Sequence, residues 1–489
     1  MSKLRNKSLT AFIWDFFGNL SSRVVGFVIS IILARLLSPE EFGMIGMVMV
    51  FTAVAQVFMN MGFGAAIVQS KDVKETTYSS VFWLNLMIGL VLTVGLFFAA
   101  RPIALFYDNS ALISITQSIS IVFVISSFGV MQKIRLVKEL NFKTQTIISF
   151  ISLFISGVLA IYLSYNGYGV FALVYQRISY TLVDVICYWI ISSWRPSFYF
   201  RLNDIRLIWG YSSKQFLDSV ISTLYSKLDV IMIGKAFSSS VLGYYTRAFS
   251  LNNMISQFTT TSLGKIFFPL MSQLQTDLDK VRNVYERVIR IIGYISILLA
   301  GFFLITADDL IIILFTDKWF ESINMFKYLV SISFFYPISV IMLSVISGLG
   351  YPGRVLISGV YKNIINIFPI IIGFLYGIES FLISRILFGL CGFWVNCFYL
   401  RRTIQIPIKE QIEYFLKPML VGIVLVFVIS SFIHNDNIYF SFFVRGILFS
   451  VSFLVISLII DTKLREVVVN EFNTMKVQFI SRNKNENVD

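Results

Sequence analysis

Charged side chains recur at helical spacing inside three long apolar stretches of this sequence. The polar positions that share a helical face are Asp15, Asn19 and Arg23 near residues 11–35, Lys214 and Asp218 near 207–234, and Arg247 and Lys265 near 241–271. Arginine and lysine can hold the oxygen atoms of phosphate or carboxylate groups. An aspartate in such a place can bind and release a proton. The pattern therefore predicts that each of these helices presents a polar face to a cavity and not to lipid, with Asp15 and Asp218 as candidates for coupling to an ion.

Two later apolar stretches add Lys362 and Arg385 to the candidate binding residues. A charge at the centre of a bilayer costs ~3 kcal/mol, so these side chains normally face a cavity or a partner of opposite charge. A structural role stays open for several of them, since Lys214 is near enough to an interface to extend its amine into water. The pairs that could be purely structural are Asp15 with Arg23, Arg177 with Asp184, and Lys214 with Asp218.

The elements that carry these residues are predicted to be membrane-spanning helices. Of the 489 residues, 57% are hydrophobic and only 14% are charged, and the mean hydropathy is +0.79. About 20 apolar residues of helix cross a bilayer, and a barrel would show short alternating segments instead. The fourteen predicted spans are residues 11–35, 42–68, 79–100, 111–132, 145–164, 168–192, 207–234, 241–271, 286–307, 322–347, 354–376, 378–400, 416–433 and 439–460.

The basic residues indicate the orientation of these spans. Most of the 40 lysines and arginines fall at the two ends of the chain or in every second gap between spans. Only four basic residues fall at the other gaps: Arg35, which is the last residue of its span, and Arg101, Lys235 and Lys318. Because cytoplasmic loops are enriched in Lys and Arg, we expect both termini in the cytoplasm. The net charge of +13 is explained by this enrichment of basic residues in cytoplasmic loops and by their attraction to anionic lipid. We therefore expect no nucleic-acid partner.

Signals for an enzyme, a metal or a cofactor are missing from the sequence. Cys187, Cys391 and Cys397 all fall inside predicted spans, so a disulfide framework is not expected. The single histidine, His434, lies in a predicted outside turn. There is no nucleotide-binding glycine loop, metal-ligand cluster or nucleophile beside a base. We therefore expect a protein that is not an enzyme and that carries no cofactor.

An internal repeat is suggested by matching turns 200 residues apart. Residues 31–43 (IILARLLSPEEFG) correspond to 231–243 (IMIGKAFSSSVLG), and residues 103–109 correspond to 312–318. Two halves of six spans each would share one orientation and be related by a twofold axis along the membrane normal. The predicted domains are an N-terminal lobe at 1–205, a C-terminal lobe at 206–405, two further spans at 406–461 and a cytoplasmic tail at 462–489.

Three segments resemble a known family. They are ARLLSPEEFG, NMGFGAAIVQSKDVKETTYSSVFWLNL at residues 60–86, and KELNFKTQ at 138–145. They are similar to the polysaccharide exporters of the MOP superfamily, the Wzx-type flippases, and most similar to the exporters of colanic acid and teichuronic acid. The resemblance implies a V-shaped, MATE-like bundle of two six-helix lobes, with two extra helices, in the cytoplasmic membrane of a bacterium.

The resemblance also implies a cargo and a mechanism. The cargo would be an oligosaccharide linked to a polyprenyl diphosphate, moved by alternating access for surface polysaccharide biosynthesis. A polysaccharide polymerase and export machinery would be further partners. Two alternatives stay open: a multidrug or metabolite exporter of the same superfamily, which usually lacks the two extra helices, and a glycan polymerase or ligase, which needs a longer outside segment than any predicted here.

Overall fold

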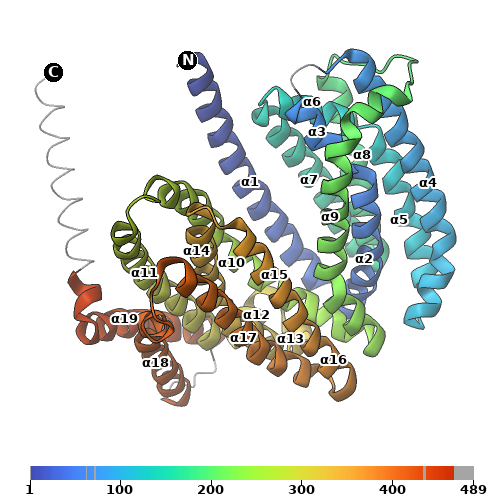
Figure 1. Ribbon diagram of the computed structural model, residues 1–489. Coiled ribbons are helices and arrows are strands. Elements are labelled where there is room, and N and C mark those ends of the chain that lie inside the picture. Colours follow the sequence, from blue (N-terminus) through green and yellow to red (C-terminus); the bar gives the residue numbers. More distant parts are fainter. Residues whose placement is uncertain (1, 62, 71–72, 433–436, 467–489) are drawn as a thin grey trace, which may run out of the picture. The chain divides into compact units, whose positions relative to one another are not determined.

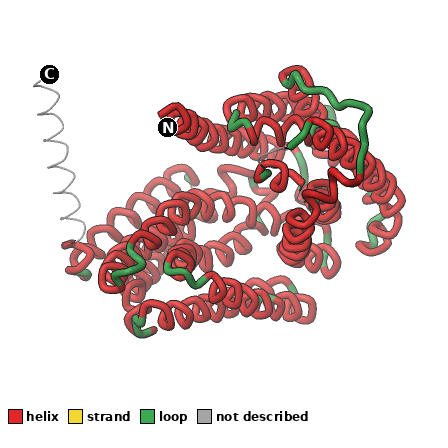
Figure 2. The backbone as a smooth tube through the Cα atoms, turned by 45° about the horizontal axis from the view of Figure 1, so that its top comes forward, coloured by secondary structure: helices red, strands yellow, loops and turns green. Residues whose placement is uncertain are grey.

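The structure is a computed structural model that describes residues 2–61, 63–70, 73–432 and 437–466. Helices make up almost all of this part of the chain, and short turns connect them (Figures 1 and 2). The described residues contain no strand. The all-helical fold predicted from the sequence is thereby confirmed. The end of the predicted tail, residues 467–489, and His434 lie outside the described residues.

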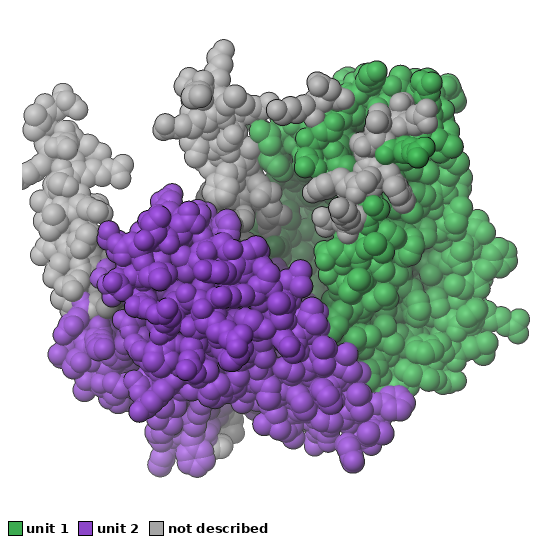
Figure 3. All heavy atoms as spheres, in the orientation of Figure 1, with its two compact units in different colours: residues 1–246 green, residues 247–489 purple. Residues whose placement is uncertain are grey.

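The chain divides into two compact units, residues 1–246 and 247–489 (Figure 3). The helices of the first unit are α1 (Ser2–Leu36), α2 (Pro39–Asn60), α3 (Phe63–Gln69), α4 (Glu75–Tyr107), α5 (Leu112–Ser127), α6 (Val130–Lys138), α7 (Phe142–Tyr165), α8 (Val170–Ile191) and α9 (Leu202–Ala236). The next helix, α10 (Ser239–Gln273), runs across the boundary between the units.

The second unit contains the remaining helices. They are α11 (Leu278–Ile305), α12 (Ala307–Phe315), the short 3₁₀ helix η1 (Asp317–Trp319), α13 (Glu321–Ser333), α14 (Phe335–Gly348), α15 (Pro352–Ile365), α16 (Ile367–Tyr376), α17 (Ile378–Ile404), α18 (Ile408–Phe432) and α19 (Ile438–Ile460). The last two helices pack on α11, so they are part of the core of this unit.

Most of the predicted membrane spans correspond to helical segments that are long and apolar enough to cross a membrane. Ten helical segments in the described part of the chain are long and apolar enough to cross a membrane, and α5 with α6 forms an eleventh that is bent by 47°. Three other helices, α1, α9 and α10, have 35 residues each, well above the ~20 that cross a bilayer. The sequence predicts one membrane passage in each of these three helices as well, which makes fourteen in all. The chain is a multi-pass membrane protein.

The start of α2 shows how the sequence sets a helix boundary. The Ser38 side chain accepts a hydrogen bond from the Glu41 backbone N–H, and the Glu41 carboxylate accepts one from the Ser38 backbone N–H at 2.6 Å. Pro39 occupies the first helical position, where its missing N–H costs nothing. This reciprocal capping fixes the turn that the sequence pattern placed between the first two spans.

Helices α2 and α10 begin in backbone contact with each other. A Cβ atom on Gly43 would overlap the carbonyl of Ser239, and a Cβ on Gly243 would overlap the carbonyl of Pro39. Residues 39 and 239 are 200 positions apart, and so are residues 43 and 243. Each glycine therefore contacts the residue that corresponds, in the predicted repeat, to the other glycine's contact. Only glycine permits this close approach.

The contact-based boundary at residue 246 differs from the lobe boundary at 205 that the repeat predicts. The reason is that α9 packs against α2, α3 and α4, all of which lie in the first unit. A helix can therefore belong to the second repeat by sequence and to the first unit by packing. The division into lobes at 1–205, 206–405 and 406–461 stays a prediction about internal symmetry.

Candidate functional site

A cavity of about 790 Å³, lined by both polar and apolar side chains, lies in the first unit. We call it the polar cavity. Residues of α2, α3, α6, α8 and α9 form most of its wall. The polar side chains that line it are Gln56, Asn60, Ser126, Lys133, Thr181, Asp184, Ser219 and Thr223. Its volume falls within the range of ~300–1,000 Å³ that is typical of small-molecule sites. Among the sites in the described chain, we take this cavity as the candidate functional site.

The cavity lies where a membrane passage is broken. Helix α5 ends at Ser127 and α6 begins at Val130, with the 47° bend between them. Gly129 lies at the break, where an added Cβ atom would come within 3.0 Å of the Val185 side chain on α8. The carbonyl of Phe128 accepts a hydrogen bond of 2.9 Å from the Trp189 indole. Discontinuous helices of this kind commonly line substrate sites in transporters.

Two opposite charges face this cavity. Lys133 comes from the first turn of α6 and is exposed, whereas Asp184 comes from α8 and is half-buried. The two groups attract each other electrostatically. Charges in a low-dielectric cavity interact more strongly than charges in water. An incoming anion can therefore replace part of the Lys133–Asp184 attraction with a direct contact to the amine.

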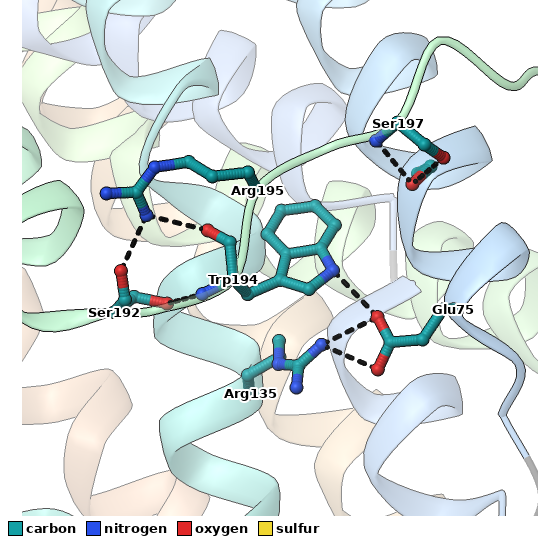
Figure 4. A network of polar contacts seen from close by, with 7 residues as sticks. Glu75, Arg135, Ser192, Trp194, Arg195 and Ser197 are labelled. Carbon is teal, nitrogen blue, oxygen red and sulfur yellow. Dashed lines mark hydrogen bonds and ion pairs between the residues drawn. The ribbon is translucent and has the colours of Figure 1, made fainter.

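The segment at residues 192–201, which we call the strap, connects α8 to α9 and holds two cavity walls in place (Figure 4). The Trp194 indole donates a hydrogen bond of 2.8 Å to the Glu75 carboxylate on α4. The same carboxylate accepts bonds of 2.9 Å at both oxygens from Arg135 on α6. The Arg135 guanidinium also lies 5.0 Å from the centre of the Tyr78 ring.

Further along the strap, serine hydroxyls of α4 bind its backbone. The Ser197 N–H donates to the Ser79 hydroxyl at 3.1 Å, as Figure 4 shows, and the Arg201 N–H donates to the Ser80 hydroxyl at 3.1 Å. Arg201 is the residue directly before α9. The strap thus ties the start of α9 to α4, while Glu75 ties α6 to the same helix. Both α6 and α9 carry residues of the cavity wall.

The residues predicted from the sequence are not gathered in this cavity. Arg23 on α1 and Asp218 on α9 are exposed and do not line it. The side chains of Asp15, Lys214 and Lys265 lie outside the described part of the structure. Their role in a binding site stays a prediction.

The remaining three candidates contact neighbours within the second unit. Only 6% of Arg247 is exposed, and its guanidinium lies over the rings of Phe315 and Trp319 at 5.1 and 5.2 Å. A cation over the faces of aromatic rings is attracted to them, which stabilises packing. The aliphatic chain of Lys362 packs beside Gly392. The guanidinium of Arg385 lies 5.6 Å from the Phe381 ring centre.

Most cavity residues were missed by the sequence analysis, although a signal was present. Gln56 and Asn60 are four residues apart in one apolar span, and Ser219 and Thr223 repeat this spacing in another. Pairs of uncharged polar residues on one helical face give a weaker signal than charges do. Lys133 lies directly after the predicted span 111–132, so the sequence does not predict it in a cavity wall.

A polar cavity inside a bundle of membrane-length helices is the architecture of a membrane transporter. The chain belongs to the polysaccharide biosynthesis protein family, whose model matches residues 32–324. The expectation of a transporter-like protein, and not an enzyme, agrees with this family.

Similar sequences among named proteins agree with this family assignment. The teichuronic acid biosynthesis protein TuaB of Bacillus subtilis (strain 168) is 26% identical over 281 residues, which cover 57% of this chain and 58% of TuaB. The succinoglycan biosynthesis transport protein ExoT of Rhizobium meliloti (strain 1021) is 25% identical, over 55% of this chain and 54% of ExoT. The lipopolysaccharide biosynthesis protein WzxC of Escherichia coli (strain K12) is 22% identical, over 65% of each chain. Each match therefore spans less than two thirds of the relative's length.

Solved structures share the fold over a larger part of the chain. The lipid II flippase MurJ, in an inward closed conformation, aligns with a TM-score of 0.71 and 17% identity, over 92% of this chain and 99% of MurJ. An inward-facing multidrug resistance transporter of the MATE family aligns with a TM-score of 0.58 and 14% identity, over 78% of this chain and 96% of its own. The MOP-superfamily fold predicted from the sequence is confirmed.

Proposed function

We propose that this protein moves an oligosaccharide linked to a polyprenyl diphosphate across the cytoplasmic membrane, as a step in surface polysaccharide biosynthesis. The observation that carries the proposal is the polar cavity of about 790 Å³ in the first unit, at the break between α5 and α6. The family supports a glycan as the cargo. The fold shared with MurJ is compatible with a large amphiphilic cargo.

The cavity offers suitable partners for both parts of such a polar head. Lys133 supplies a positive charge for the diphosphate. The carboxamides of Gln56 and Asn60 each carry donors and acceptors, which match the hydroxyl groups of sugars. These contacts lower the cost of bringing a hydrated, charged head to membrane depth. Asp184 repels the anion when no cation balances it, which favours release.

Alternating access is the mechanism that we propose for the translocation. The break between α5 and α6 gives one cavity wall a place to bend, and small changes at such a place can open or close a site. We expect both termini in the cytoplasm, so that the cavity residues near Lys133 load from that side. A polysaccharide polymerase acting on the outer surface would then receive the product.

The residues predicted from the sequence extend this proposal. Arg23 and Asp218 are exposed. With Lys214, Lys265, Lys362 and Arg385, we expect them to line the path of the anionic head outside the cavity. Asp15 and Asp218 are the candidates for coupling to an ion. For Arg247, the aromatic contacts favour a packing role over direct contact with the cargo.

Substitution of the cavity residues tests this function in cells that lack the gene. We expect Lys133→Ala and Asn60→Ala to reduce surface polysaccharide and to leave lipid-linked oligosaccharide on the inner leaflet. Losing a hydrogen bond to a charged group costs ~1.5–3 kcal/mol. The diphosphate head should therefore bind to Lys133→Ala at least ~tenfold more weakly than to the wild type. Lys143→Ala is the matched control, because the Lys143 amine lies 5.2 Å from the Trp14 ring centre and not in the cavity.

The outcome separates this function from drug export, which the MATE fold also supports. Normal polysaccharide in both cavity variants, at normal protein level in the membrane, would refute the role of the cavity. If cells lacking the gene make normal polysaccharide but become sensitive to toxic cations, the drug exporter is the correct interpretation.

A further inference from the structure

A second concavity in the first unit is apolar and has a volume of about 750 Å³. It lies between α2, α4 and α9, and every residue that lines it is apolar. Along α4 it extends from Val91 to Phe106, a distance of ~22 Å at 1.5 Å per helical residue. We call this feature the apolar groove. Its length and composition suit a hydrocarbon chain. Its apolar side chains offer no hydrogen bond to a polar molecule.

The apolar groove and the polar cavity are built on two shared helices. On α2, Asn60 lines the cavity and Phe58 lines the groove. On α9, Thr223 lines the cavity and the next residue, Leu224, lines the groove. One helix pair therefore presents a polar face to one side and an apolar face to the other, as the two ends of an amphiphile require.

An aromatic pair marks the place where the two features meet. Phe58, from the groove, and Phe216, from the cavity, contact each other edge to face, with ring centres 5.1 Å apart and planes at 75°. Phe58 is 37% exposed, so the pair is not buried in the core. At this pair, a lining residue of the polar cavity contacts a lining residue of the apolar groove.

We propose that the apolar groove holds the polyisoprenoid chain of the same lipid whose diphosphate head enters the polar cavity, with Phe58 and Phe216 at the junction of head and chain. This inference rests on the function proposed above and adds a place for the lipid chain in the first unit. The covalent link between head and chain is the reason to assign this occupant. A head bound in the cavity brings its own chain to the adjoining groove at high effective concentration, ahead of free bilayer lipids.

A glycine in the groove provides a direct test. Gly95 lines the groove on α4, and a Cβ atom added there would meet no atom within 4 Å. Gly95→Trp should therefore fill the groove without disturbing the packing of α4. Gly359→Trp is the matched control, because Gly359 on α15 is equally open and lies outside both the cavity and the groove.

The test measures binding of two purified probes, a long-chain polyprenyl-diphosphate glycan and a water-soluble analogue with a very short chain. We expect Gly95→Trp to bind the long-chain probe at least tenfold more weakly and the short-chain probe as the wild type does. Gly359→Trp should bind both normally. Unchanged affinity of Gly95→Trp for the long-chain probe would overturn the inference.

Photo-crosslinking separates the substrate chain from ordinary lipid. A photoreactive residue at position 95 should capture the long-chain probe in preference to phospholipid, whereas one at Phe98, which is 73% exposed, should capture both in proportion to their abundance. Equal capture ratios at the two positions would mean that bilayer lipid fills the groove, and this would also overturn the inference. If wild-type protein binds neither probe, the proposed function fails, and the inference falls with it.

Discussion

We expect Asp461→Asn to destabilise the second unit by roughly 3–5 kcal/mol, the usual cost of removing one partner of a buried ion pair. Asp461 directly follows α19, and its side chain is 2% exposed. Its carboxylate accepts hydrogen bonds from the Arg290 guanidinium at 2.9 Å, the Tyr294 hydroxyl at 3.1 Å and the Leu464 N–H at 3.1 Å. Asparagine keeps the shape of the side chain but leaves the positive charge of Arg290, only 11% exposed, without a counter-charge.

Denaturant titration in detergent micelles, followed by circular dichroism, measures this loss. The double variant Arg290→Met with Asp461→Asn removes both charges, and we expect it to recover most of the stability because no uncompensated buried charge remains. A cost below about 1 kcal/mol for Asp461→Asn alone would refute the reasoning. A double variant less stable than the single one would refute it as well.

The same pair predicts a dependence on pH. Burial by itself raises the pKa of the Asp461 carboxyl, but the Leu464 N–H, Arg290 and Tyr294 outweigh it and hold the pKa below its ordinary value of 3.8. A depressed pKa means that the unfolded chain binds a proton first as the pH falls. The contribution of Asp461 is therefore complete above pH 3.8 and is lost below it. The stability gap between wild type and Asp461→Asn should narrow only in that acidic range.

Two further predictions concern the first unit. Gly43→Val should lower the thermal stability of this unit, because the new side chain overlaps the carbonyl of Ser239 and overpacking costs ~1–3 kcal/mol. An unchanged melting temperature would contradict the close contact of α2 and α10. Glu75→Gln should loosen the strap, because the carboxylate that binds the Trp194 indole and the α6 guanidinium loses its charge. Trypsin should then cut faster after Arg201, and an unchanged rate would show that the strap does not depend on Glu75.

The sequence predicts the fold of this protein well because membrane helices obey a one-dimensional rule. Each span needs ~20 apolar residues, and such runs can be counted without knowing any neighbour. The sequence also predicts an internal repeat, since residues 31–43 and 231–243 end and start helices at matching places. The reciprocal contact of Gly43 with Ser239 and of Gly243 with Pro39 has the same spacing.

The candidate site could not be predicted to the same degree. Helical spacing shows which residues share a face but not which neighbour that face meets, so it cannot show that the Arg247 guanidinium lies over the Phe315 and Trp319 rings. Lys133 reaches the cavity because of the break at Phe128 and Gly129, which contains no proline to signal it. Asp184 was noted only as a partner of Arg177, whereas the structure places it in the cavity wall with Lys133.

The most direct test of the central claim is lipid translocation by the purified protein in vesicles. Labelled polyprenyl-diphosphate oligosaccharide is placed in one leaflet, and a membrane-impermeant enzyme that cleaves the glycan measures its arrival in the other. We predict that the wild type speeds this arrival over protein-free vesicles, that Lys133→Ala slows it at least tenfold, and that a labelled phospholipid is not moved. Arrival no faster than in protein-free vesicles, or equal transfer of the phospholipid, would contradict the account.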